Sequence, residues 1–140
     1  MRVKEHILAS STLAIVFYYF THSLPGAGLV LFSGIFIDLD HLFDFWITRP
    51  VNPFSIKEFM HPCKYMRENR KVYVFLHNYE LVIMLWILAW HFSWPPIILG
   101  IASGITLHLI LDDIGNELIT FSYFFIYRAA KKFAVFTEKY

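Results

Sequence analysis

Apolar residues gather in four blocks along the chain, separated by short turns or by one long polar stretch. The blocks are Ile7–Phe20, Leu24–Ile37, Leu81–Trp90 and Ile97–Leu111. Crossing the roughly 30 Å core of a bilayer takes about 17–25 helical residues, so each block needs flanking residues, some of them ionisable, to complete a span. The pattern predicts four transmembrane helices, at about 6–22, 25–46, 77–93 and 95–114. Gly100, Ser103 and Gly104 form a small-residue face that could pack against a helix of the same chain or a second subunit, which leaves a homo-oligomer open.

Composition strengthens the membrane interpretation. Of 140 residues, 57% are hydrophobic and 16% are charged, against roughly 45–50% and 25% in soluble domains. Two alternatives stay open: the blocks could be buried helices of a soluble protein, or residues 1–24 could be a cleaved signal peptide. A net charge of +1 argues against a nucleic-acid partner. Cys63 is the only cysteine, so any metal must be held by nitrogen and oxygen ligands.

The basic residues avoid two of the turns. Residues 21–28 and 92–96 carry no charge, whereas all 12 Lys and Arg lie at the N-terminus, in 49–71 or in 128–139. By the positive-inside rule, both termini and the central loop, 48–74, are cytoplasmic. The sequence therefore predicts an integral protein of the cell or inner membrane, built from two transmembrane hairpins that a cytoplasmic loop joins.

Two further elements are expected on the cytoplasmic side. A short helix is predicted around Ile56–Met60, between proline breaks. An amphipathic helix that lies in the membrane interface is predicted over about 118–137, with phenylalanines on one face and basic residues on another. The phenylalanines that can share a face are Phe121, Phe125, Phe133 and Phe136. The expected fold class is all-α: one membrane domain, residues 1–140, with a four-helix transmembrane bundle and a C-terminal interfacial helix.

Side chains that bind metals occur at the cytoplasmic ends of all four predicted spans. These residues are His6, Asp38, Asp40, His41, Asp44, His77, Glu80, His108, Asp112 and Asp113. Residues four apart lie on one face of a helix, so His108 and Asp112 can reach the same ion. Carboxylates buried in lipid are costly unless they pair with or bind cations. The coincidence predicts a divalent metal centre with ligands among His6, Asp38, Asp40, His41, His77, Glu80, His108 and Asp112.

Each group also has a simpler interpretation. The histidine and aspartate of the fourth helix could be a hydrogen-bonded pair at a helix end, and the run Asp38–Asp44 could cap a helix or be solvated among headgroups. His22 and His91 fall on the opposite side of the membrane and are interpreted as interface residues. Glu58 and His61 lie in the polar loop and are interpreted as solvated, unless the loop folds back over the site.

Two motifs resemble a known family. A G-x-x-x-D-x-D-H run spans Gly34–His41, and a G-x-x-x-H-x-x-x-D run spans Gly104–Asp112. With an early histidine and a histidine that opens the third span, they resemble the LexA-binding, inner-membrane-associated hydrolases, also described as membrane-bound metal-dependent hydrolases. That family is similar to the zinc-dependent phospholipase C fold, a helical bundle with a multinuclear zinc centre. The metal positions that the resemblance implies are Asp38, Asp40, His41, His77, His108 and Asp112.

The chain departs from that family at two positions. Ile37 stands where the family usually has proline before its first aspartate. Of the family's H-R-G-x-T-H-S motif the chain keeps His77, and Glu80 is the candidate substitute for the second histidine.

The ligand types suggest a chemistry. They admit zinc, manganese or iron, and the resemblance favours zinc and more than one ion. A bound divalent ion activates water and neutralises charge on a phosphoryl oxygen, with Asp44 or Asp113 as the expected general base. Because the site lies at headgroup depth, the expected substrate is a lipid phosphoester. The alternative is a non-catalytic membrane protein whose His and Asp cluster binds a structural or transported divalent metal.

Overall fold

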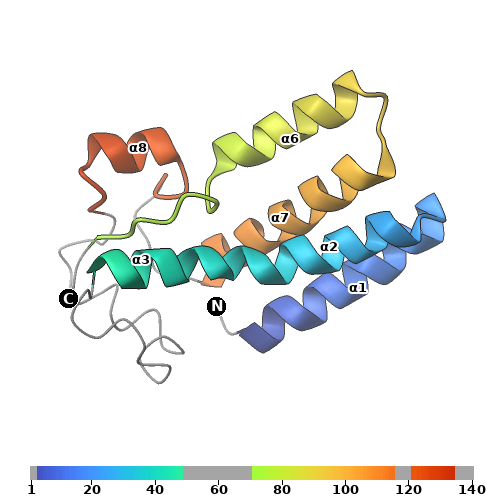
Figure 1. Ribbon diagram of the computed structural model, residues 1–140, viewed down its shortest axis with the longest axis horizontal. Coiled ribbons are helices and arrows are strands. Elements are labelled where there is room, and N and C mark those ends of the chain that lie inside the picture. The colour runs from blue at the N-terminus through green and yellow to red at the C-terminus, as the bar shows by residue number, and fades with distance from the viewer. Residues whose placement is uncertain (1–2, 49–70, 116–120, 135–140) are drawn as a thin grey trace.

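The computed structural model describes residues 3–48, 71–115 and 121–134 (Figure 1). Its helices are α1 (Val3–Thr21), α2 (Leu24–Phe36), the 3₁₀ turn η1 (Ile37–Leu39), α3 (Asp40–Thr48), α6 (Tyr79–His91), α7 (Pro96–Gly115) and α8 (Phe125–Ala130). The described residues contain no β-strand, apart from one isolated bridge, so the all-α prediction is confirmed for them. The helix expected at Ile56–Met60 lies outside the described residues, as do Glu58 and His61.

Two tight turns fold the long helices into hairpins. Between α1 and α2, the Ser23 side chain caps α2 by accepting a hydrogen bond from the Gly26 amide at 3.2 Å. Between α6 and α7, Ser93 and Trp94 adopt left-handed conformations with φ values of 62° and 61°. The Trp94 amide then donates to the Ala89 carbonyl oxygen at 2.7 Å. Both turns lie in the two uncharged segments of the sequence.

Glycines set the distance between α2 and α7, which lie side by side in Figure 1. A Cβ atom at Gly100 would collide with the Gly26 carbonyl oxygen, and one at Gly104 would collide with the Val30 carbonyl oxygen. The two backbones therefore approach as closely as at small-residue interfaces between membrane helices. The sequence left open whether these glycines pack against a helix of the same chain or against a second subunit. In the structure they pack against α2 of the same chain.

Two helical stretches of the described residues are long and apolar enough to cross a membrane. They are Leu24–Ile47, with 24 residues and a mean hydropathy of 1.5, and Pro96–Gly115, with 20 residues and a mean hydropathy of 1.8. Helix α6 is apolar but has 13 residues, and α1 opens with the polar residues Lys4, Glu5 and His6. Membrane crossing by all four predicted helices therefore stays a prediction.

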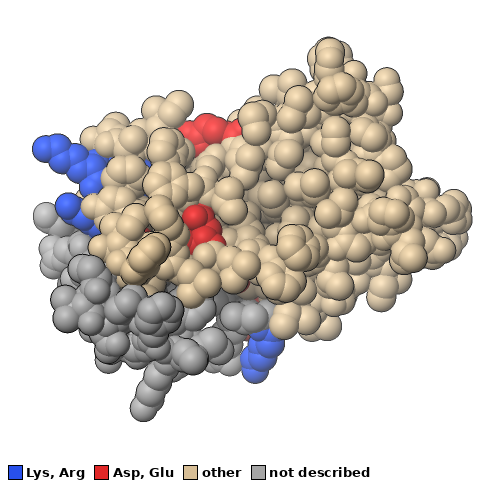
Figure 2. Space-filling model, in the orientation of Figure 1, with Lys and Arg blue, Asp and Glu red and all other residues tan. Residues whose placement is uncertain are grey.

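Charged side chains lie toward one end of the molecule. The face in Figure 2 carries Lys, Arg, Asp and Glu around α3 and α8, and it carries none near the two interhelical turns. Large apolar side chains are exposed along the long helices, for example Leu8, Ile15, Phe20, Leu24, Ile87 and Trp90. Soluble monomers rarely expose continuous apolar surface on this scale. An apolar surface of this extent marks a contact with a membrane or with another protein.

The C-terminal segment differs from the expected helix over about 118–137. Of its described residues, only Phe125–Ala130 are α-helical. Lys132 and Phe133 follow with positive φ values of 52° and 64°, which end the helix. Arg128 was expected on a basic outer face, but it is 2% exposed. Arg128 turns inward because its guanidinium donates a hydrogen bond to the backbone carbonyl oxygen of His77, in the bend before α6.

The charge pattern generates a labelling prediction. In sealed, right-side-out membrane vesicles, Cys63 should react with an impermeant maleimide only after permeabilisation, because the central loop is expected inside. A Trp94→Cys variant in a Cys63→Ser background should react without permeabilisation. Labelling of both positions, or of neither, in sealed vesicles would contradict the topology.

The glycine contact generates a stability prediction. Gly104→Ala should lower the free energy of unfolding by about 1–3 kcal/mol, because its methyl group meets α2 backbone atoms. Gly28→Ala is the matched control on α2, since nothing lies within 4 Å of its added Cβ. Thermal unfolding in detergent, followed by circular dichroism, compares them. Equal melting temperatures for the two variants would show that close helix approach does not matter.

Candidate metal centre

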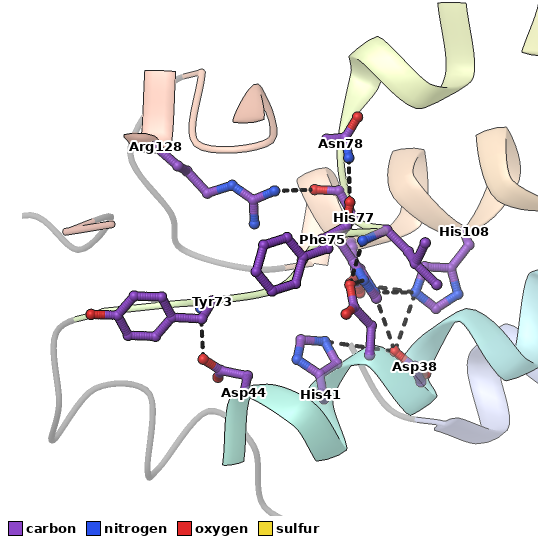
Figure 3. Close-up of polar contacts among 12 residues, drawn as sticks. Asp38, His41, Asp44, Tyr73, Phe75, His77, Asn78, His108 and Arg128 are labelled. Carbon is purple, nitrogen blue, oxygen red and sulfur yellow. Dashed lines mark hydrogen bonds and ion pairs between the residues drawn. The ribbon is translucent and has the colours of Figure 1, made fainter. Parts of the chain in front are cut away.

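Four side chains from separate parts of the chain converge at the charged end of the bundle. Asp38 comes from η1, His77 from the bend before α6, and His108 and Asp112 from α7. One ligand atom from each lies within 4.8 Å of the others. The carboxylate of Asp38 is partly exposed, and the other three side chains are buried. Figure 3 shows Asp38, His77 and His108 pointing toward one another.

The packing of α2 on α7 orients His108. This residue follows Gly104 by four positions, so it continues the face of α7 that contacts α2. Its Nδ1–H donates to the Gly34 carbonyl oxygen at 2.9 Å, so in the neutral imidazole Nε2 carries no hydrogen and can bind a metal. His108 Nε2 lies 3.3 Å from Asp38 Oδ1 and 3.6 Å from Asp112 Oδ2.

His77 reaches the group from a bend rather than from a helix. Its Nε2 lies 3.5 Å from Asp38 Oδ1 and 3.3 Å from His108 Nε2. Its Nδ1 lies 3.4 Å from Asp40 Oδ2. The same Asp40 oxygen accepts a hydrogen bond from the Leu76 amide. One carboxylate therefore holds both the backbone of the bend and the ring of His77.

Three of the ligand atoms are spaced like corners of a tetrahedral metal site. Ligands bound at the zinc–nitrogen and zinc–oxygen distances of about 2.0–2.1 Å lie roughly 3.3–3.4 Å apart in a tetrahedron. Asp38 Oδ1, His77 Nε2 and His108 Nε2 form a triangle with sides of 3.3, 3.3 and 3.5 Å. Asp112 Oδ2 lies 3.6 Å from His108 Nε2, and the Asp112 carboxylate offers an oxygen within 4.8 Å of the other ligand atoms, which makes it the candidate fourth ligand. Two imidazoles and two carboxylates are a donor set that zinc, manganese and iron all accept.

Two more histidines border this group. His6 Nε2 lies 3.2 Å from Asp112 Oδ1, and its ring stacks on His108 with 4.0 Å between centroids. His41 Nε2 lies 3.8 Å from Asp38 Oδ1. The sequence-predicted ligands that the structure brings together are His6, Asp38, Asp40, His41, His77, His108 and Asp112.

Glu80, the remaining predicted ligand, faces a different element. Its Oε2 accepts a hydrogen bond from the Phe125 amide at 2.9 Å, and its Oε1 accepts one from the Ile126 amide at 3.1 Å. Amides in the first turn of a helix have no partner inside the helix, so a carboxylate satisfies them. In this arrangement Glu80 anchors α8, and the structure does not bring it into the group of four.

The two predicted general bases also lie apart from the four converging ligand atoms. Asp44 is fully buried in α3, and its Oδ1 accepts a hydrogen bond from the Tyr73 amide at 2.6 Å. Asp113 is exposed on α7, where its Oδ2 accepts a hydrogen bond from the Tyr79 hydroxyl at 3.3 Å. Asp112 and Asp113 are neighbours in sequence, so they point to different sides of the helix.

Arg128 is a residue at this site that sequence reasoning missed. Its Nη2 donates to the His77 carbonyl oxygen at 2.9 Å, and its guanidinium lies 5.9 Å from the Phe125 ring centroid. Burial lowers the pKa of this guanidinium, and the carboxylates of Asp40 and Glu80 raise it in part. An arginine stays protonated in either case. In the sequence it is one basic residue among several in an aromatic tail, and no spacing distinguishes it.

Comparisons of the chain with family models, curated proteins and solved structures found no match. The resemblance to the LexA-binding, inner-membrane-associated hydrolases therefore rests on the motifs at Gly34–His41 and Gly104–Asp112 alone. The grouping of Asp38, His77 and His108 does not depend on that resemblance, since it follows from the fold.

The geometry generates a metal-content prediction. Protein purified in detergent should carry a transition metal, and Asp38→Asn and His108→Ala should each lose it, because each change removes a corner of the ligand group. Asp113→Asn, an exposed carboxylate next to a predicted ligand, is the control and should keep the metal. Inductively coupled plasma mass spectrometry measures the content. Wild-type metal content in both ligand variants would rule out this site.

Proposed function

We propose that the protein is a membrane-embedded, metal-dependent hydrolase that acts on a phosphoester of a lipid or lipid-like substrate at the cytoplasmic leaflet. The observation that carries the proposal is the convergence of Asp38, His77, His108 and Asp112 at the polar end of an otherwise apolar bundle. The group holds one buried and one partly exposed carboxylate, and a buried carboxylate costs several kcal/mol unless a cation compensates. A divalent ion is the compensation that this donor set fits.

These four residues hold the ion in the proposal, and zinc is favoured. When bound, a divalent ion would lower the pKa of a coordinated water and neutralise charge on a phosphoryl oxygen. The Gly34 carbonyl and the Asp40 carboxylate keep the two imidazoles turned toward Asp38. The resemblance suggests more than one ion, and His6, which contacts Asp112 from α1, is the candidate ligand for a second one.

The position of the site favours a lipid substrate. The apolar surface of the long helices lies next to the charged end that carries the ligands. In a membrane, a phosphate headgroup would reach the site while its acyl chains stay in the hydrocarbon region. Among the four ligands, Asp38 is the one with a partly exposed carboxylate, so it marks the side from which water and substrate enter.

Proton transfer is assigned to His41. Asp44 is buried against Tyr73 and Asp113 faces outward, so neither predicted base lies at the ligand group. His41 lies 3.8 Å from Asp38 and its side chain is 15% exposed. The neutral imidazole in that position lies close enough to the ligand group to accept a proton from a nearby water.

The rival function is a non-catalytic membrane protein in which the ion holds the bundle together or is transported. The buried position of three of the four ligands favours the structural version. Transport needs polar groups along a path, whereas the candidate ligands of the described residues lie at one end. The rival predicts that removing the metal lowers the melting temperature without loss of any reaction.

An activity assay separates these functions. Wild type, Asp38→Asn, His41→Ala and Asp113→Asn are reconstituted with zinc in vesicles that contain phosphatidic acid and phosphodiester phospholipids, and release of inorganic phosphate or phosphorylated headgroup is measured. Wild type and Asp113→Asn should be active, and Asp38→Asn should lose both metal and activity. His41→Ala should keep its metal while turnover falls about 10²–10⁴-fold, the usual contribution of a proton-transfer group. Zinc-loaded wild type without phosphoester hydrolysis would favour the rival.

A further inference from the structure

We propose that Arg128 is a positioning residue of the metal centre, which holds the His77 imidazole in place through the His77 carbonyl group. The guanidinium does not contact any of the four converging ligand atoms, so its role is indirect. The inference rests on the proposed metal centre and adds a residue from the C-terminal segment to it.

The bend that carries His77 is closed locally by Asn78, which donates from its side chain to the Phe75 carbonyl oxygen and from its backbone amide to the Leu76 carbonyl oxygen. Residues 75–77 belong to neither a helix nor a strand. On the amide side, Asp40 accepts the Leu76 N–H and contacts the His77 ring. On the carbonyl side, the Arg128 Nη2 donates to the His77 oxygen at 2.9 Å (Figure 3). Charged side chains thus contact the backbone on both sides of the ligand, in addition to the local hydrogen bonds from Asn78.

The helix that carries Arg128 is itself anchored to α6. Glu80 accepts hydrogen bonds from the first amides of α8, and the Tyr79 amide donates to the Tyr123 carbonyl oxygen at 2.9 Å. On the other side of the bend, the Val72 amide donates to the Phe133 carbonyl oxygen at 3.1 Å. The C-terminal segment is therefore hydrogen-bonded to the chain both before and after His77. Arg128 lies between these two sets of hydrogen bonds in the sequence.

The charge of Arg128 suits this place. Among the buried residues that the structure describes, it is the one Lys or Arg, and the buried carboxylates include Asp40 and Asp44. A buried guanidinium is costly without acceptors nearby. An exposed position directly after α8 holds a basic side chain, as Lys131 shows. A neutral side chain at position 128 would leave the His77 carbonyl group buried without this donor.

Cobalt(II) titration tests the inference, because the visible spectrum of bound cobalt reports ligand number and geometry as well as affinity. The full-length protein in detergent is compared with Arg128→Met, Arg128→Gln and Arg128→Lys. The two neutral variants should bind cobalt 10–100-fold more weakly, the loss typical when a partner of a metal ligand is removed, with a changed spectrum. Arg128→Lys keeps a charged donor and should recover most of the affinity. Arg128→Gln carries the test if Arg128→Met does not fold.

Lys131→Met is the matched control. Lys131 lies on the same segment, and its ammonium is 5.9 Å from the Tyr127 ring centroid, yet it is exposed. It should keep wild-type affinity and spectrum. Equal weakening in Lys131→Met, or wild-type affinity and spectrum in a folded neutral variant, overturns the role of Arg128 while the metal centre stands. A wild-type protein that binds neither cobalt nor zinc overturns both proposals.

Discussion

The close approach of α2 and α7 is the constraint on which the candidate centre depends. Only glycines at this interface let the Gly34 carbonyl oxygen come within 2.9 Å of His108 Nδ1. That single hydrogen bond decides which imidazole nitrogen carries hydrogen, and it turns the other toward Asp38. An interface that brings helices together in the apolar part of the bundle thus selects the tautomer of a neutral imidazole at its polar end.

The second constraint is charge. Asp38, Asp40, Asp44 and Asp112 lie close together at one end of the bundle, and three of them are buried. Histidines surround them, and Arg128 is the nearby cation that burial makes costly. An arrangement of this kind is stable only if positive charge balances it, from protonated imidazoles, a metal ion or both. The proposed ion supplies this positive charge, so several adjacent imidazole rings need not be protonated at the same time.

The sequence predicted the helices and the ligand group better than it predicted their surroundings. Periodic spacing could place His108 and Asp112 on one face, because that follows from a regular helix. The alternation of hairpins could put His6 and His77 at the same depth, although His77 lies in the bend just before α6. It could not show that Glu80 reaches α8 or that Arg128 turns inward. Those contacts join residues 45 or 51 positions apart through a bend and a short helix, for which no pattern exists.

The centre gathers residues from almost the whole length of the chain. His6 lies near the start of α1, Asp112 near the end of α7, and Arg128 in α8. A chain under synthesis therefore exposes its acidic η1–α3 segment long before the partners of that segment exist. The four candidate ligands are present together only once α7 is made, so the proposed ion would bind late in synthesis and would couple its binding to the folding of these segments. A chain that stops before α8 would keep the helical hairpins and still lack the contact that fixes His77.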